Sequence, residues 1–480
     1  MSETQKYGGT WRLFEKEQLY QGELHINYEK RVIALEILIP ASDEKPMPRP
    51  PYKGKIPYVC GTLFSGAKVL LYQCSTGKEH SHILSHTQQI IYADYAFWGL
   101  EVKSEDEIKF SNITFDFGEI IDWSGLCRYD WDFSEDGGSN LLWIHKNPVT
   151  FNLNENLELT FYPNQGSIGG DMHGKEIKVN QRVLIQFAYN KPTTLDIIIE
   201  DALCIQYLIG LGINDKVEID NVRYEHSSIY MEFDNREGTS EKKYISADML
   251  IGTGIISPTP SVRQYDCLFT LEDINKNKND IFTKWKSYYT ILKPVLDLYF
   301  TAFSKNAGTS EMLFLNLAQA LETYHARFVA DDVKEYIARV DIIVDNFCHG
   351  NSNSQSWKEF LLDDGQRTSK RIYLRSRLSD LIFAEGILPF WPNNYKKDEY
   401  IRKVVDTRNY YTHYDPEKLD KAFSKVELPF INGHLIALLQ FHILVLIGFD
   451  PDAVRKKTVE RIRKIDDAYY IQEHTHDIER

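Results

Sequence analysis

The spacing of apolar residues changes near residue 265 of this 480-residue chain. Before that point apolar and polar residues often alternate, for example at Ile113, Phe115 and Phe117 and again at Val217 and Ile219. Clusters of Gly, Asn and Pro separate these runs. A period of two is typical of half-buried antiparallel strands, because successive side chains of a strand point to opposite faces. We therefore predict that the first part of the chain is mainly β.

Long segments with few Gly or Pro residues follow residue 270, for example 281–303 and 311–328. In the second of these segments, apolar residues recur at helical spacing: Leu313, Leu317, Ala320, Leu321 and Tyr324. This spacing predicts amphipathic helices that bury one face. The predicted fold class is α+β multidomain, with a β-rich N-terminal domain followed by an all-α helical domain.

The same change in periodicity predicts two domains, at residues 1–265 and 268–480, with a boundary in the polar stretch around Pro258 and Pro260. Charge is also divided unevenly. Residues 1–267 hold 25 Lys and Arg against 38 Asp and Glu, whereas the remainder of the chain holds 30 against 31. An acidic surface repels RNA, so we expect the first domain to meet a protein and any RNA site to lie in the second.

A short motif near the C-terminal end places an arginine five residues before a histidine: Arg408-Asn409-Tyr410-Tyr411-Thr412-His413. Cleaving RNA without a metal needs a base for the ribose 2′-hydroxyl, a proton donor for the leaving 5′-oxygen and a fixed cation beside the crowded phosphorane. Histidine and arginine supply these groups at neutral pH. The motif indicates ribonuclease chemistry, with Arg408, Asn409 and His413 as candidate catalytic residues.

The spacing within this motif adds a geometric constraint. Five residues correspond to about 140° around an ideal helix, so Arg408 and His413 would not share one face. Either the last turn loosens ahead of Pro416, or a second chain completes the site. His413 should lie in the last helical turn, whose exposed carbonyls attract positive charge.

A second set of motifs lies near the N-terminus: Gly9-Thr10-Trp11, Gly22-Glu23-Leu24, Cys60-Gly61, Gly66 and Lys68-Val69-Leu70-Leu71-Tyr72-Gln73-Cys74. These segments resemble the N-terminal domain of ApeA-type abortive-infection proteins. The Arg408–His413 motif resembles the R-x4-6-H element of HEPN ribonucleases. ApeA-type proteins join these two domains, so together the resemblances cover most of the chain.

The resemblance implies an antiphage endoribonuclease of the HEPN type, which cleaves RNA by metal-independent attack of the 2′-hydroxyl. It also implies a homodimer or higher homo-oligomer formed through the helical domain, and a phage protein as a possible trigger. The chain departs from HEPN toxins controlled by tyrosine nucleotidylation, because Asp415 stands where their tyrosine lies. The alternative is a non-catalytic helical interaction module joined to a β-rich binding domain, in which Arg408 and His413 only cap and pair.

Several further residues are candidates for a role near this motif. Glu322 and His325 lie three apart on one face of a predicted helix and, with Tyr411, are candidate supporting residues. An ordinary solvated helix face with a local ion pair is the alternative for the first two. A basic cluster offers candidate RNA contacts at Arg371, Arg375 and Arg377, because Lys and Arg side chains bind phosphates. Such charged faces are also common simply as solvated surfaces.

Other features narrow the class of protein. The segment Leu428 to Phe449 has no charged residue, but Asn432, His434, Gln440 and His442 favour a buried central helix over a membrane span. Residues 1–9 are polar, without the apolar stretch of a signal peptide, so we expect a cytoplasmic protein. We found no phosphate-binding loop, dinucleotide fingerprint or zinc motif, so we expect no cofactor and no metal.

Overall fold

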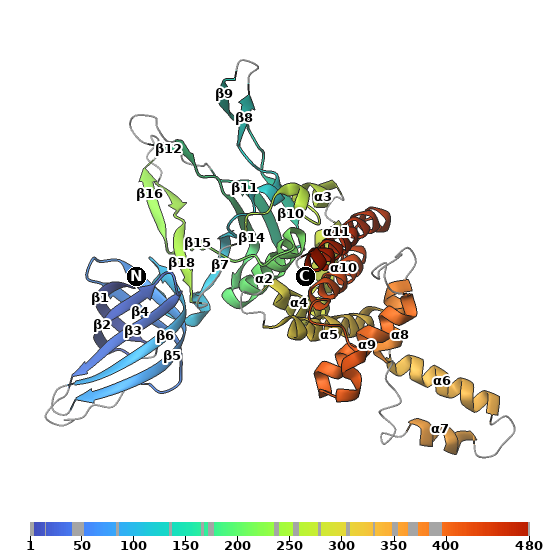
Figure 1. The fold of residues 1–480 in the computed structure, drawn as a ribbon. Helices are drawn as coiled ribbons and strands as arrows, with labels where there is room; N and C mark the ends of the chain where they lie inside the picture. The colour runs from blue at the N-terminus through green and yellow to red at the C-terminus, as the bar shows by residue number, and fades with distance from the viewer. Residues whose placement is uncertain are drawn as a thin grey trace. The chain divides into compact units, whose positions relative to one another are not determined.

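The computed structural model describes residues 4–14, 16–40, 52–82, 86–133, 137–164, 168–170, 177–234, 240–252, 259–276, 280–303, 308–329, 332–347, 354–362, 373–383 and 396–478. The chain forms two compact units, Met1–Asn279 and Asp280–Arg480. The first unit is rich in strands and the second is helical, as Figure 1 shows for each unit by itself. This arrangement confirms the predicted fold class.

The division between the units falls later in the chain than the expected boundary at 265–268. Residues after 265 still pack on the first unit: the amide of Leu268 donates to the carbonyl of Gly212 at 2.7 Å, and Leu268 and Phe269 are buried. Helix α3 (Leu271–Lys276) continues this packing against α1 (Ile121–Ser124). Apolar contacts therefore carry the first unit past the change in periodicity. Of the two boundary prolines, Pro258 lies outside the described residues.

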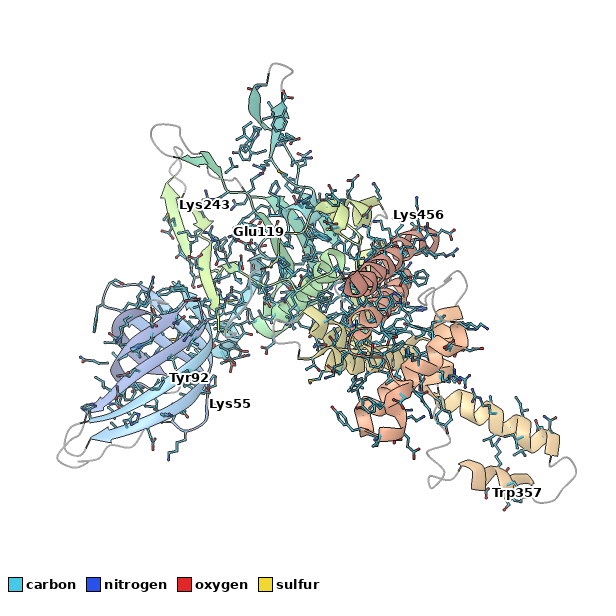
Figure 2. The ribbon with its side chains drawn as sticks, viewed as in Figure 1. Lys55, Tyr92, Glu119, Lys243, Trp357 and Lys456 are labelled. Carbon is cyan, nitrogen blue, oxygen red and sulfur yellow. The ribbon has the colours of Figure 1, made fainter. Side chains whose placement is uncertain are left out.

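The first strands of the chain form a barrel: β1 (Thr4–Leu13), β2 (Leu19–Asn27), β3 (Val32–Pro40), β4 (Lys55–Leu63), β5 (Lys68–His82) and β6 (His86–Trp98). They pair in the order β6, β3, β2, β1, β4 and β5, and β5 also pairs with β6. Side chains alternate between the core and the surface. Ile91 and Ala93 are buried, whereas Tyr92 between them is exposed on the outside (Figure 2).

The indole of Trp11 fills part of the barrel core and brings together the N-terminal motifs. Trp11 pairs with Gly61 of β4, and its Nε1 donates to the carbonyl of Gly22 on β2 at 3.2 Å. A Cβ atom at Gly61 would overlap the six-membered ring of the indole. Glycine is therefore required at position 61 because it leaves room for Trp11.

Replacing Gly61 by Ala should destabilise the barrel, because overpacking a filled core typically costs about 1–3 kcal/mol. The measurement is the free energy of unfolding in urea, followed by circular dichroism. The double variant Gly61→Ala/Trp11→Phe has a smaller ring at the contact. It should lose less stability than the sum of the two single changes. A stability of Gly61→Ala equal to wild type would contradict this packing.

A second group of strands continues the sheet beyond the barrel: β7 (Lys109–Asp116), β10 (Val149–Asn152), β11 (Leu157–Pro163), β14 (Val183–Thr194), β15 (Asn221–Glu225) and β18 (Ala247–Ile251). Their order is β10, β11, β14, β7, β15 and β18, and β18 pairs with β6 of the barrel. Helix α2 (Leu195–Ile213) contacts β7 and β14. Phe115 of β7 and Phe187 of β14 stack edge to face in this core.

Short hairpins extend from this sheet as separate two-stranded ribbons (Figure 1). They are β8 (Tyr129–Phe133) with β9 (Ser139–Trp143), β12 (Ile168–Gly170) with β13 (Ile177–Val179), and β16 (Tyr230–Asp234) with β17 (Ser240–Tyr244). Large apolar side chains on two of these hairpins are exposed, including Phe133, Trp143 and Met231.

The second unit contains the helices α4 (Asp280–Phe300), α5 (Ser310–Phe328), α6 (Asp332–Phe347), α7 (Ser354–Leu362), α8 (Leu374–Phe383), α9 (Lys397–His413), α10 (Leu428–Leu446) and α11 (Pro451–Ile478). Helix α10 is central, because it contacts α5, α8 and α11. By length and composition α10 could cross a membrane, but 72% of its apolar window is buried within the protein. Its polar residue His442 is bonded inside the core, with Nε2 2.9 Å from the carbonyl of Leu381. Burial lowers the pKa of His442 to about 4.

Candidate active site in the helical unit

Helix α9 presents the Arg408–His413 motif in its last two turns. The helix is anchored by buried side chains on one side: Tyr400, Ile401, Val404 and Thr407. The hydroxyl of Thr407 accepts a hydrogen bond from the amide of Phe423 at 2.8 Å, which ties α9 to the segment that follows it. These contacts fix the helix that carries the motif.

Helix α9 ends at His413 for local reasons. Tyr414 has a left-handed backbone with φ 52°, which is a common way to end a helix. Asp415 then caps the short 3-10 helix Pro416–Lys421, accepting a hydrogen bond from the amide of Glu417 at 3.1 Å. The chain remains α-helical through His413, so its last turn does not loosen ahead of Pro416.

The two principal side chains of the motif therefore lie on different faces of α9, about 140° apart on an ideal helix. Arg408 is half-buried and His413 is exposed at the helix end. The shorter arc between them carries Asn409 and Thr412. Arg408 Nη1 lies 3.4 Å from Oδ1 of Asn409, and the hydroxyl of Thr412 donates to the carbonyl of Arg408 at 2.7 Å.

Glu322 of α5 is the acidic partner of Arg408, with Nη2 and Oε2 3.7 Å apart. Both side chains are partly exposed, so this ion pair orients the guanidinium more than it stabilises the fold. The guanidinium has five N–H donors, so its contacts with Glu322 and Asn409 still allow it to bind an anion. Glu322, expected to support the site, lies beside the motif.

His325, one turn further along α5, points instead into the core between α5 and α8. Its Nε2 lies 2.9 Å from Oδ2 of Asp380, and its Nδ1 lies 3.3 Å from Nη1 of Arg377. Because arginine can only donate, Nδ1 of His325 is the acceptor and Nε2 carries the hydrogen that meets the carboxylate. Arg377 also donates to the carbonyl of Glu322 at 3.3 Å.

These contacts correct the role expected for Arg377. Arg377 is only 6% exposed, so its guanidinium is not available to follow an RNA backbone. Its guanidinium links α8 to α5 instead, through the carbonyl of Glu322 and the ring of His325. Glu322 is also the residue that pairs with Arg408. Arg375 is exposed and stays a candidate RNA contact. Arg371 lies outside the described residues.

Asp380 was not singled out from the sequence, although it completes this network. Its partner His325 lies 55 residues away along the chain. The local pattern around Asp380 is that of an ordinary helix surface, so no signal at the level of sequence spacing marks it. Glu322 and His325 share one helix face but serve different neighbours, α9 and α8 respectively.

Tyr411 lies on the face of α9 that turns away from Asn409 and Thr412. Its ring contacts those of Tyr410 and Tyr414, with centroids 4.9 Å and 6.4 Å apart. Burial raises the pKa of Tyr411, and the nearby Glu311 adds to this effect. Tyr411, expected to support the motif, therefore belongs to a separate aromatic cluster.

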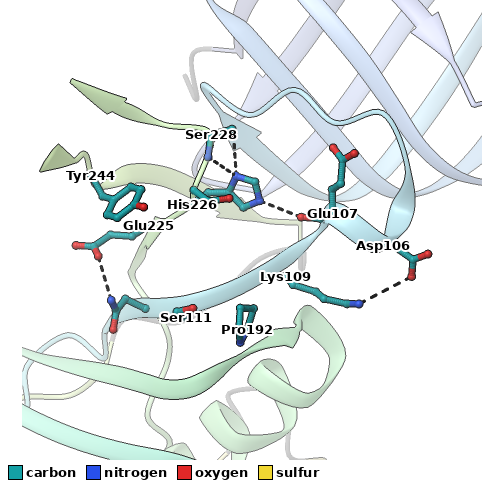
Figure 3. A pocket seen from close by; sticks show the side chains of 11 residues that line it. Asp106, Glu107, Lys109, Ser111, Pro192, Glu225, His226, Ser228 and Tyr244 are labelled. Atoms are coloured by element: carbon teal, nitrogen blue, oxygen red, sulfur yellow. Dashed lines mark hydrogen bonds and ion pairs between the residues drawn. The ribbon is translucent and has the colours of Figure 1, made fainter. Parts of the chain in front are cut away.

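The first unit has a pocket of its own, of about 660 Å³, between β7, β15 and β17 (Figure 3). Its polar side chains largely bond with neighbours: Asn112 donates to Glu225 at 3.1 Å, and Nε2 of His226 lies 2.9 Å from the carbonyl of Glu107. Lys109 faces Asp106 at 3.9 Å. The imidazole of this pocket, His226, is buried with both ring nitrogens engaged, by Ser228 and by the carbonyl of Glu107, whereas His413 is exposed. We therefore place the candidate active site in the second unit.

Comparison with models of known protein families shows which family the chain belongs to. The model of ApeA N-terminal domain 1 matches residues 6–285, more than half of the sequence. The chain belongs to the ApeA family. The match spans the barrel and the glycine and tryptophan motifs around Trp11. No curated protein and no solved structure matches the chain.

A second family model, Apea-like HEPN, matches residues 315–453 of this ApeA protein. The matched segment runs from α5 to the start of α11 and contains Glu322, Arg408 and His413. Both resemblances drawn from the sequence are thereby confirmed. HEPN domains are typical of ribonucleases, so the match supports a nuclease role in abortive infection.

Proposed function

We propose that the protein is an antiphage endoribonuclease that cleaves RNA at the Arg408–His413 motif without a metal ion. The observation that carries the proposal is the arrangement on α9. Arg408 is oriented by Glu322, and His413 is exposed at the helix end one turn away. Attack by a ribose hydroxyl on a phosphodiester needs a fixed cation and an accessible imidazole, and this helix carries both.

In the proposed reaction, His413 takes the proton from the 2′-hydroxyl, and the 2′-oxygen attacks phosphorus. The bond from phosphorus to the 5′-oxygen breaks, and the imidazolium returns its proton to that oxygen. Arg408 stabilises the charge on the non-bridging oxygens of the phosphorane. Asn409 orients the phosphate or the imidazole. The products carry a 2′,3′-cyclic phosphate and a 5′-hydroxyl.

We further propose that two chains complete each site. Arg408 and His413 diverge by about 140° on a regular helix, so one phosphate group is not easily held by both side chains of a single chain. A two-fold axis beside the ends of two α9 helices would place Arg408 of one chain opposite His413 of the other. This geometry supports a homodimer formed through the helical unit.

The acidic first unit acts in this proposal as the sensor of infection in the cytoplasm. Its net charge of −13 over residues 1–267 disfavours RNA and suits a protein partner, such as a phage protein. Binding of that partner relieves the restraint on the nuclease, which then cleaves RNA and stops growth of the infected cell.

The ends of the products test the chemistry. RNA fragments made by the purified protein should resist 3′-end ligation until the cyclic phosphate is opened and removed. They should accept phosphate at the 5′-end without prior dephosphorylation. Fragments with a free 3′-hydroxyl and a 5′-phosphate would contradict attack by the 2′-hydroxyl and point to a metal-activated water.

A further inference from the structure

A pocket of about 710 Å³ lies against α9 on the side that the proposed reaction does not use. Its walls come from the start of α5, from α9 and from the segment after η5 (Pro416–Lys421). Tyr410, Tyr411 and Tyr414 line it together with Met312 and Leu315. Ligand pockets of this size are typical of sites for small molecules or single groups of a larger ligand.

The three tyrosines form one cluster within the pocket. Tyr410 and Tyr411 meet with centroids 4.9 Å apart and planes at 66°, and Tyr414 meets Tyr410 at 5.9 Å and 66°. These are edge contacts, so the rings do not cover one another face to face. Tyr414 is 69% exposed and leaves most of its ring open to a flat ligand.

The charged side chains of the pocket disfavour a phosphate inside it. Three carboxylates line the walls, those of Glu311, Asp420 and Glu427, against the amines of Lys403 and Lys425. Lys403 is bonded to Glu427 at 2.9 Å, and Lys425 faces Glu311 at 3.9 Å. A neutral aromatic ligand fits such walls better than an anion does.

The position of the pocket links it to the motif. Tyr414 follows His413 directly, and consecutive Cα atoms lie about 3.8 Å apart. The candidate histidine and the tyrosine pocket are therefore carried by adjacent residues at the end of α9. Unstacked bases of single-stranded RNA commonly stack on aromatic side chains, which bases inside a duplex cannot do.

We propose that this tyrosine pocket binds one unstacked nucleobase of the RNA substrate, next to the bond that is cleaved. The inference rests on the proposed ribonuclease function and adds the substrate class: single-stranded RNA or unpaired loops rather than duplex. The base stacks on Tyr414 and Tyr411, while its phosphate and ribose stay outside the acidic walls.

Binding can be measured apart from cleavage. The full chain with His413→Ala is titrated in EDTA with a fluorescently labelled single-stranded RNA oligonucleotide of mixed sequence. Adding Tyr411→Ala or Tyr414→Ala should weaken binding by about 5-fold to 100-fold, the usual effect of removing one stacking partner. Tyr411→Phe and Tyr414→Phe keep the rings and should keep the affinity. Duplex RNA should respond to none of these changes.

A matched control comes from Tyr265 of the first unit, which is 71% exposed and distant in sequence from the motif. When Tyr265→Ala is added to the His413→Ala chain, the affinity for single-stranded RNA should not change. In addition, 4-thiouridine in the oligonucleotide should cross-link on illumination to the peptide that holds Tyr410 to Tyr414. The proposal would be overturned if adding Tyr411→Ala or Tyr414→Ala left the affinity of the His413→Ala chain for single-stranded RNA unchanged and the cross-link formed at another peptide.

The two proposals fail in different ways. Absence of RNA cleavage by both the wild-type chain and the helical unit 280–480 contradicts the ribonuclease function, whatever the tyrosines do. Normal cleavage of single-stranded RNA by folded Tyr411→Ala and Tyr414→Ala variants, with unchanged KM, contradicts the nucleobase pocket alone. Circular dichroism of each variant confirms the fold before these comparisons.

Discussion

His413→Ala and Arg408→Ala should each reduce the rate of RNA cleavage by at least about 100-fold, because each removes a group for which the reaction has no substitute. Loss of a positioned acid or base usually costs about 10²–10⁴ in rate, and loss of a group that stabilises the transition-state charge costs about 10²–10³. Neither side chain lies in the apolar core, so both variants should stay folded.

Controls of the same residue type make this result specific. Arg402 is an exposed arginine on the same helix, and His145 is an exposed histidine in the first unit. Arg402→Ala and His145→Ala should cleave RNA at the wild-type rate. Cleavage at the wild-type rate by folded His413→Ala or Arg408→Ala would remove these residues from the proposed site.

Mixing the two inactive variants should restore part of the activity. In a dimer of one Arg408→Ala chain and one His413→Ala chain, one of the two composite sites holds a complete Arg408 and His413. Equal mixing of freely exchanging chains makes half of the dimers mixed, so about a quarter of the wild-type activity should return. The measurement is the cleavage rate of a labelled RNA against mixing ratio.

The opposite outcome is equally clear. If each chain carries its own complete site, a mixed dimer has no site with both groups and the mixture stays inactive. Subunit exchange must be verified, for example with two differently tagged chains. An active variant that light scattering shows to be monomeric at the assay concentration would also contradict the composite site.

The spacing of apolar residues predicted which side chains are buried, but it did not distinguish strands from irregular segments. Ile113, Phe115 and Phe117 alternate and are buried on or just after β7 as expected. Val217 and Ile219 have the same alternation and are buried as well, yet they lie in an irregular segment before β15. Alternating burial produces the same sequence pattern in a strand and in an irregular segment. The pattern therefore does not show whether the backbone forms hydrogen bonds with a neighbouring strand.

The sequence revealed the Arg408–His413 motif, but not the residues that surround it in the folded unit. The spacing of Arg408 and His413 is local and can be read directly. Arg377 stood in a basic cluster that suggested RNA contacts, yet it is buried against His325, 52 residues away along the chain. Contacts of this kind depend on how α5 and α8 pack, which residue spacing on one helix does not encode. The tyrosine pocket likewise needs the start of α5 to form its second wall.

The central claim is tested most directly by incubating the purified wild-type chain with total RNA in excess EDTA, beside the His413→Ala/Arg408→Ala double variant. The proposed mechanism predicts that the wild-type chain cleaves RNA at an undiminished rate in EDTA and that the double variant leaves the RNA intact. If the sensor restrains the nuclease, the helical unit 280–480 alone is assayed in the same way. RNA left intact by both the full chain and the helical unit, or equal cleavage by wild type and double variant, would contradict the account.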